Sequence, residues 1–147
     1  MNIKVATSQF ATIKDDFDSN LNKAIKLIED AAKENVDILL LQELFLDNYF
    51  CSTKNDKFFN LAIDFPSNPM FEKLSNICKS KKISLPISFF QKDGTKYFNS
   101  LVMIDSDGKY SEVYNKSHIP EGVGYNEKYY FKKGTTGFMV FDTPKAK

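Results

Sequence analysis

An unbroken aliphatic run at residues 38–41, in the stretch VDILLLQELFL, constrains the fold of this chain more than any other feature. Such a run is typical of a strand that is buried on both faces of a sheet. Before it, residues 17–35 carry Leu, Ile and Ala at the spacing of one helix face, and residues 3–10 alternate loosely as a strand does. A strand, a helix and a buried strand in this order predict a β-α-β opening, with Asp18 or Ser19 as the cap of the helix.

The second half of the chain predicts one more helix and an antiparallel meander. Asn68 and Pro69 are a helix cap and a proline in the first turn, and apolar residues recur at helical spacing after them. Three strand-like runs follow, separated by two Asp-Gly turns, at residues 83–90, 97–105 and 110–116. The predicted fold class is therefore α/β, with a mixed sheet, in one domain of a size that suits 147 residues.

Composition narrows the classes of function. The 20 Lys and Arg against 19 Asp and Glu give a net charge of +1, which provides no basic face for nucleic acid. No apolar run approaches the roughly 20 residues of a membrane-spanning helix, and the start of the chain lacks the apolar segment of a signal peptide. Two cysteines make no disulfide framework, so we expect a reducing, cytoplasmic setting without nucleic-acid or membrane partners.

Glu43 is the first residue of chemical interest, because it follows the buried run and stands among Leu and Phe residues. Open α/β sheets place their active sites at the carboxyl ends of strands, and a carboxylate desolvated there has its pKa raised toward that of a useful general base. The same pattern also fits a Glu that merely turns outward at the end of a strand. The residues alone leave both interpretations open.

Lys116 ends the last strand of the meander, and His118, the one histidine of the chain, follows it. A fixed ammonium at such a place can stabilise an oxyanion, although most lysines are simply solvated. His118 alone cannot build a His-rich metal site, and a histidine near a strand end is more often structural. Glu127, in YNEKYYF, stands among aromatic residues that could bury it, and a surface position fits its pattern equally well.

The glycines and cysteines indicate neither a phosphate site nor a convincing nucleophile. Neither G-x-G-x-x-G nor G-x-x-x-x-G-K-[S/T] occurs, so Gly134 and the glycines around it are interpreted as turn residues. Cys78 falls on the apolar stripe of the second helix and is interpreted as core. Cys51 is interpreted as a packed loop residue, with a thiolate near Glu43 as the lesser alternative.

Taken together, several stretches resemble the nitrilase superfamily of carbon–nitrogen hydrolases, and within it the subgroup that hydrolyses N-carbamoylputrescine and N-carbamoyl amino acids. These stretches are KVATSQF, DILLLQELFLDNYFC, LPISFF, YFNSLVMIDSDG and YNKSHIPEGVGYNEKYYFKKGTTGF. The resemblance implies an α-β-β-α sandwich and a Glu-Lys-Cys triad that uses neither metal nor organic cofactor. It implies that Glu43 is the general base, that Lys116 stabilises the oxyanion, and that Glu127 helps to hold the lysine and the substrate.

The resemblance also implies what residues 1–147 leave out. The family's nucleophile lies in a motif of the form G-x-x-I-C-W-D shortly after the segment that matches GFMVFDT, whereas this chain reads GFMVFDTPKAK. We therefore expect a partial domain, the N-terminal half of the sandwich, with helices on one face of its sheet. We expect it to be inactive alone and, in its full-length form, to be a homo-oligomer that hydrolyses a small carbamoyl or amide compound.

Two alternatives to this expectation remain. In the first alternative, the chain is a non-catalytic truncated homologue that acts as an interaction module through its open sheet. In the second, activity is kept by recruiting Cys51 or a second polypeptide that carries the missing half. Retention of Glu43, Lys116 and Glu127 favours the enzyme, because a drifting non-catalytic homologue is expected to lose some of them.

Overall fold

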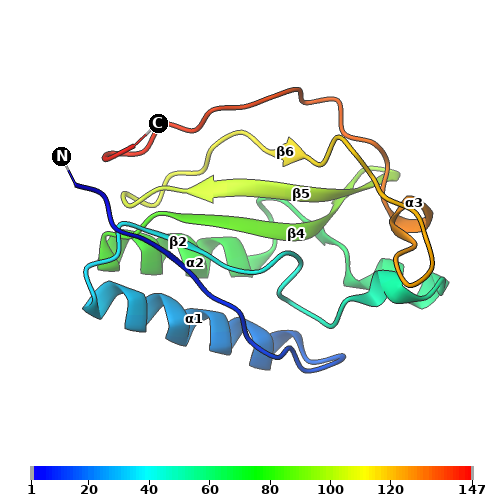
Figure 1. Cartoon of the computed structure of the whole chain (residues 1–147), viewed down its shortest axis with the longest axis horizontal. Coiled ribbons are helices and arrows are strands. Elements are labelled where there is room, and N and C mark those ends of the chain that lie inside the picture. The colour runs from blue at the N-terminus through cyan, green and yellow to red at the C-terminus, as the bar shows by residue number, and fades with distance from the viewer. Residues whose placement is uncertain (1, 147) are drawn as a thin grey trace.

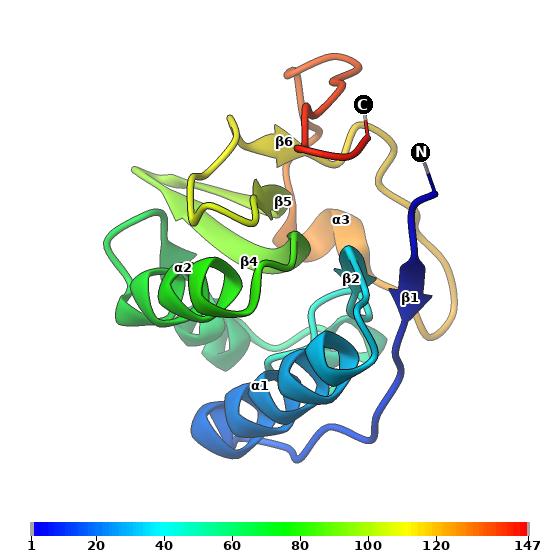
Figure 2. The ribbon, with the colours of Figure 1, turned by 90° about the vertical axis from the view of Figure 1, so that its left-hand side faces the viewer.

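Two long helices cover one face of a mixed β-sheet in the computed structural model, which describes residues 2–146 (Figure 1). The strands are β1 (Val5–Thr7), β2 (Ile38–Leu40), β3 (Ile63–Asp64), β4 (Leu85–Asp93), β5 (Lys96–Ile104) and β6 (Tyr114–Asn115). The helices are α1 (Phe17–Lys33), α2 (Pro69–Lys81) and α3 (Glu127–Tyr130), with two 3-10 turns, η1 (Phe50–Ser52) and η2 (Asp56–Leu61). The predicted mixed sheet with helices on one face is confirmed, and Figure 2 shows both helices on the same side of it.

The β-α-β opening is present, because β1 and β2 pair in parallel on either side of α1 in the sequence. The N-cap is Asp16, whose carboxylate accepts a hydrogen bond from the Ser19 N–H at 3.0 Å. The expected caps were therefore wrong: Asp18 and Ser19 lie within the first turn of the helix, two and three residues beyond the residue that satisfies its free N–H groups.

β2 is buried on one face only, so the expectation of a strand buried on both faces was wrong. Leu39 is 2% exposed and belongs to the main core, whereas Leu40 is 42% exposed. The reason is the arrangement of layers: the helices pack on one face, and the described residues leave the other face of this strand open. The strand also ends at Leu40, before the turn that carries Glu43.

α2 begins as its sequence predicts. Asn68 is the N-cap and accepts a hydrogen bond from the Met70 N–H at 3.0 Å, while Pro69 opens the first turn. The buried face of the helix packs into the same core as α1 and the central strands. Its buried residues are Met70, Phe71, Leu74 and Cys78, which confirms Cys78 as a core residue.

The meander is β4-β5-β6, and the Asp93-Gly94 turn closes its first hairpin. The third strand is shorter than the predicted run at 110–116, because only Tyr114 and Asn115 form a ladder with β5. The β5–β6 register places Lys116 opposite Asn99, whose carbonyl accepts the Lys116 N–H at 2.9 Å. A parallel bridge between Ile38 of β2 and Ser84, the residue before β4, joins the two parts of the sheet, so β2 lies beside the start of β4.

Gly134 lies against the backbone of Asn115, and its interpretation as a turn glycine was wrong. A Cβ atom there would be 2.1 Å from the Asn115 carbonyl oxygen, which is far inside van der Waals contact. The Gly134 N–H donates to the carbonyl of Lys116 at 2.9 Å. The absence of a side chain at Gly134 therefore lets the segment after α3 pack directly against the end of β6, next to Lys116.

Gly134→Ala is expected to lower the free energy of unfolding by about 3 kcal/mol, because the clash is with backbone that can only shift as a unit. Gly124→Ala is the matched control. Gly124 has φ +84, and a Cβ added there would meet no atom within 4 Å, so its loss is expected to be about 1 kcal/mol, from the left-handed backbone alone. Urea unfolding of the two variants measures the difference, and equal losses would contradict the close approach at Asn115.

Candidate active site

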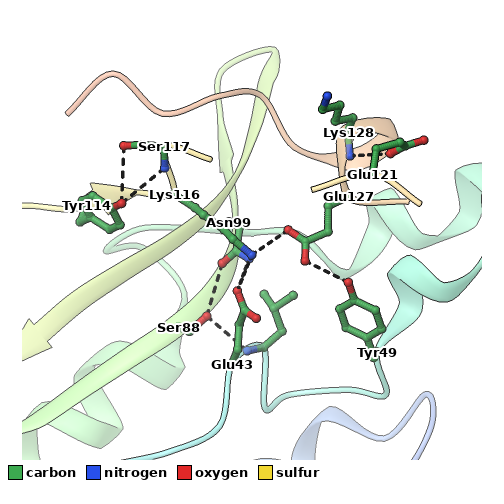
Figure 3. A network of polar contacts seen from close by, with 11 residues as sticks. Glu43, Tyr49, Ser88, Asn99, Tyr114, Lys116, Ser117, Glu121, Glu127 and Lys128 are labelled. Atoms are coloured by element: carbon green, nitrogen blue, oxygen red, sulfur yellow. Dashed lines mark hydrogen bonds and ion pairs between the residues drawn. The ribbon is translucent and has the colours of Figure 1, made fainter. Parts of the chain in front are cut away.

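Glu43, Lys116 and Glu127 come from three separate parts of the chain and meet at one point (Figure 3). The Lys116 Nζ lies 3.1 Å from Glu43 Oε1 and 2.8 Å from Glu127 Oε2. The ammonium therefore stands between two carboxylates and donates a hydrogen bond to each. All three candidate residues named from the sequence are brought together by the fold.

Backbone contacts on both sides hold Lys116. Its N–H donates to the Asn99 carbonyl on β5, and its own carbonyl accepts from Gly134. The lysine side chain starts from a peptide fixed at both ends, which reduces the conformational entropy lost when the ammonium is placed. Its side chain is 28% exposed, so the ammonium is partly withdrawn from water.

Glu43 lies in the turn that follows β2, and its side chain is 49% exposed. Desolvation of this carboxylate, one of the two interpretations that the sequence left open, is therefore not found within residues 2–146. Its Oε1 accepts hydrogen bonds from the Asn99 Nδ2 at 2.7 Å and from Lys116. Its Oε2 accepts none from the described residues, so this oxygen is free to take a proton.

Glu127 is the opposite case, a buried carboxylate with both oxygens occupied. Its side chain is 4% exposed at the start of α3; Oε2 accepts from Lys116, and Oε1 accepts from the Tyr49 hydroxyl at 2.9 Å. Burial, and then the hydrogen bond to Glu127, raises the pKa of Tyr49, so its hydroxyl stays protonated and continues to donate. Glu127 is thus a buried counter-ion of Lys116 whose two oxygens both accept hydrogen bonds.

Lys116 remains charged in this setting. Burial lowers the pKa of its ammonium, but the hydrogen bonds to Glu127 and Glu43, and then the charges of Glu43 and Glu127, outweigh burial and raise the pKa above its ordinary value. A lysine held in the ammonium form cannot accept a proton at neutral pH. It can stabilise negative charge that develops on an oxygen placed beside it.

An apolar groove of about 320 Å³ opens beside Glu43 and Lys116. Its lining residues are Leu40, Leu41, Glu43, Ser88, Asn99, Ser100, Leu101, Tyr114 and Lys116. The leucines and Tyr114 give the groove an apolar wall, and the Glu43–Lys116 pair gives it one charged end. Such a combination suits a small organic molecule with a polar group at one end.

The loops that carry Tyr49 and Glu127 are held together by an aromatic cluster, which comprises Phe50, Phe58, Phe59, Phe90, Tyr97, Tyr130 and Phe131. The Tyr130 hydroxyl donates to the Thr53 carbonyl at 2.6 Å and accepts from the Asn55 N–H at 2.9 Å. These bonds tie α3 to the segment between η1 and η2. Glu127 is therefore placed by packing across about half the chain, not by its neighbours in sequence.

Cys51 lies inside the aromatic cluster and is 0% exposed, as is Cys78 in the main core. Burial, and then the negative charges of Glu127 and Glu43, raises the pKa of the Cys51 thiol to about 12, against a smaller opposing effect of Lys116. Burial raises the pKa of Cys78 to about 12 as well. Both thiols are protonated and enclosed, so neither is available as a nucleophile.

Iodoacetamide at about pH 8 is expected to leave Cys51 and Cys78 unmodified in the folded protein and to modify both in urea, because only the exposed thiolate reacts. Peptide mass mapping measures this site by site. Rapid labelling of Cys51 in the folded protein would contradict its enclosure. It would also reopen the alternative in which this thiol serves the site beside Glu43.

His118 is exposed and makes no hydrogen bond or ion pair with the other residues that the structure describes, so it takes no part in the Lys116 network. Within residues 2–146, no group of three or more His, Cys, Asp and Glu side chains is placed to hold a metal ion. None of the helices in this range is long and apolar enough to cross a membrane.

Three residues of the network were missed in the sequence: Tyr49, Ser88 and Asn99. Asn99 carried a signal, since asparagine is uncommon in the middle of a strand and this one stands inside an otherwise apolar run. Tyr49 and Ser88 carried none, because a tyrosine in a loop and a serine in an alternating strand are ordinary. Tyr49 contacts Glu127, which is 78 positions away in the sequence. Ser88 accepts the N–H of Leu44, which is 44 positions away.

The family model described as carbon–nitrogen hydrolase matches residues 4–147. The chain is 41% identical over 145 residues to an N-carbamoylputrescine amidase of Solanum lycopersicum, covering 99% of this chain and 48% of that protein. It is 44% identical over 146 residues to a citrullinase of Francisella tularensis, covering 99% of this chain and 51% of that protein.

The fold gives the same result. A carbon–nitrogen hydrolase of Helicobacter pylori superposes with a TM-score of 0.86 at 31% identity, over 97% of this chain and 48% of that one. The chain thus spans about half the length of the curated relatives that it matches.

Proposed function

Because the chain belongs to the carbon–nitrogen hydrolase family, we propose that it carries the base and the oxyanion-stabilising lysine of an enzyme that hydrolyses a linear carbamoyl or amide group. The observation that supports this most is the lysine held between two unlike carboxylates at the end of an apolar groove. Glu43 has a free oxygen and is the base. Glu127 has none and holds Lys116 in place.

The nucleophile in this proposal is a thiol from outside residues 1–147. Neither Cys51 nor Cys78 qualifies, because both are enclosed and protonated. Glu43 takes the proton of the incoming thiol, which attacks the carbamoyl carbon, and Lys116 faces the charge that develops on the oxygen. Protonated Glu43 returns the proton to the leaving nitrogen, so that ammonia leaves and the carboxylate is restored. Glu43 then activates a water molecule that hydrolyses the carbamoyl thioester.

For a carbamoylated amine the reaction balances with one water molecule, giving the free amine, carbon dioxide and ammonia. We propose N-carbamoylputrescine as the substrate and hence a role in polyamine synthesis. The lining of the groove supports this choice. Leucine and tyrosine side chains suit the alkyl chain. Lys116, the only cation among the lining residues, is held at the charged end by Glu43 and Glu127, so no lining cation opposes the ammonium at the far end of the alkyl chain.

Citrulline is the competing substrate, since a citrullinase is among the relatives. It carries the same ureido group on a short alkyl chain but adds an α-carboxylate. Among the residues that line the groove, the only cation is Lys116, and its charge is already matched by Glu43 and Glu127. An additional carboxylate would therefore enter this groove without a partner from residues 2–146.

The test measures ammonia release by the protein as its gene encodes it, with N-carbamoylputrescine and citrulline offered separately. We expect kcat/KM to be at least about tenfold higher for N-carbamoylputrescine, the size of effect that one unpaired charge produces. The reverse preference would overturn the substrate. Turnover of neither compound would overturn the enzyme, and favour the interaction module. A polypeptide of residues 1–147 alone is expected to be inactive with both.

We place the enzyme in the cytoplasm, where two free buried thiols are stable in reduced form. We also propose that it works as a homo-oligomer. Size-exclusion chromatography with light scattering of the encoded protein checks the second point.

A further inference from the structure

Asn99 is a buried polar residue in the middle of β5, 4% exposed, and it contacts Glu43, Lys116 and Ser88. Its Nδ2 donates to Glu43 Oε1 at 2.7 Å, the shortest hydrogen bond that this carboxylate receives. Its main-chain carbonyl accepts the N–H of Lys116 at 2.9 Å. One residue therefore holds the carboxylate through its side chain and the lysine through its backbone.

These contacts close a ring. The backbone N–H of Lys116 is bound to the Asn99 carbonyl, and the Lys116 ammonium donates to Glu43 Oε1. The Asn99 amide donates to this same Glu43 oxygen. The separation between the base and the lysine is thus set from both sides by a residue on a central strand. Sites built on central strands are held more precisely than sites built on loops.

The orientation of the Asn99 amide is set in turn by Ser88 on β4. The Ser88 hydroxyl lies 3.4 Å from Asn99 Oδ1, and it accepts the N–H of Leu44 at 3.2 Å. The Ser88 hydroxyl proton is therefore available to the amide oxygen, and this leaves the amide NH2 to face Glu43. Leu44, directly after Glu43, has φ 52, a left-handed conformation that a leucine rarely adopts.

We infer that Asn99 is a positioning residue for the reaction, and that Ser88 orients it. Asn99 occupies Oε1 of Glu43 together with Lys116, so that Oε2 is the oxygen presented for proton transfer. The inference deepens the proposed function and rests on it. It differs from a purely structural role, in which Asn99 would fill space and satisfy its hydrogen bonds without affecting turnover.

Asn99→Asp tests this with little change in volume, because it replaces the amide donor by an oxygen that repels Glu43. We expect kcat to fall about 100-fold and KM to change less than about threefold, as when a catalytic group is displaced without loss of substrate contacts. Asn20→Asp is the matched control. Asn20 is 0% exposed and donates only to the carbonyls of Ile13 and Leu46, so it should lower the melting temperature and leave kcat within about twofold.

Ser88→Ala is the milder variant in case Asn99→Asp does not fold, and its expected loss in kcat is about tenfold, since Asn99 remains but its amide is less firmly oriented. A change confined to KM, or kcat values equal to the control for both variants, would overturn the inference.

A thermal double-mutant cycle with Glu43→Gln needs no activity. The fall in melting temperature caused by Asn99→Asp should shrink by at least half when Glu43 is also replaced, because the repulsion is then absent. Strict additivity would overturn the contact. If the unmodified protein hydrolyses neither ureido compound, the proposed function fails, and this cycle still decides whether Asn99 holds Glu43.

Discussion

Lys116→Met should abolish almost all turnover and also destabilise the protein. A single oxyanion donor accounts for about a hundred- to a thousand-fold in rate, and this one also holds Glu43. The loss of the ammonium leaves two carboxylates facing each other, one of them 4% exposed. We expect kcat to fall about a thousand-fold, and the free energy of unfolding to fall by about 2 kcal/mol, less than for a fully buried pair because Lys116 and Glu43 are partly solvated.

The stability part of this prediction has a definite pH window. The pKa of Lys116 is raised in the folded protein above its ordinary value of 10.5, so folding favours the charged form. Its contribution is therefore fully present below pH 10.5 and is lost as the pH rises through the folded value. Urea unfolding at a series of pH values should show a constant gap between wild type and Lys116→Met up to that point and a narrowing gap beyond it.

Lys133→Met is the control, because Lys133 is exposed and has no hydrogen bond or ion pair among residues 2–146. It should leave turnover and unfolding within experimental error. A Lys116→Met protein that keeps more than a tenth of its turnover would contradict the oxyanion role. One that is as stable as wild type would contradict the ion-pair geometry instead.

The second large effect is an asymmetry between the two carboxylates. Glu43→Gln should lower kcat by about a thousand-fold, because the amide cannot accept the proton. It should leave the free energy of unfolding almost unchanged, because the Glu43 side chain is 49% exposed. Glu127→Gln should act mainly on stability. The Glu127 side chain is 4% exposed, and this substitution removes the negative charge that accepts hydrogen bonds from Lys116 and Tyr49. We expect the free energy of unfolding to fall by about 2 kcal/mol.

Measuring kcat and urea unfolding on the same preparations separates the two carboxylates. Glu72→Gln, on the exposed face of α2, serves as the control for a lost surface charge. If Glu127→Gln loses as much turnover as Glu43→Gln while keeping its stability, then Glu127 takes part in proton transfer and the assignment of the two roles is wrong.

Local signals in the sequence were sufficient for the two long helices and the hairpin turns, whereas the short helix α3 was not predicted. The periodicity at 17–35 and the Asn68-Pro69 pair specify α1 and α2, because a helix is determined largely by spacing and capping within the segment itself. The strands predicted at 3–10, 36–46 and 110–116 were too long, since a ladder needs a neighbour and residues 36–46, for example, have one only at Ile38–Leu40. The two strands of the hairpin were predicted at nearly their full length. Local pattern also could not show that Gly134 is required by the backbone of a residue 19 positions earlier.

The site shows the same limit. Pattern alone left Glu43, Lys116 and Glu127 undecided, and only the family resemblance singled them out together. The structure adds what neither could supply: which oxygen of Glu43 is free, which carboxylate is buried, and that Asn99 contacts both Glu43 and Lys116. These depend on pairs of residues up to 78 positions apart, whose geometry is set only when the sheet is complete.

The separation of the site in sequence also governs when it forms. Lys116 meets Glu43 across 73 positions, and Glu127 meets Tyr49 across 78. Contacts between distant segments close late, because the entropy lost on joining their ends must be offset by packing already in place. We therefore expect the ammonium to acquire its two counter-ions late in folding, after the hairpin of β4 and β5 is available. The site itself should then report that folding has finished.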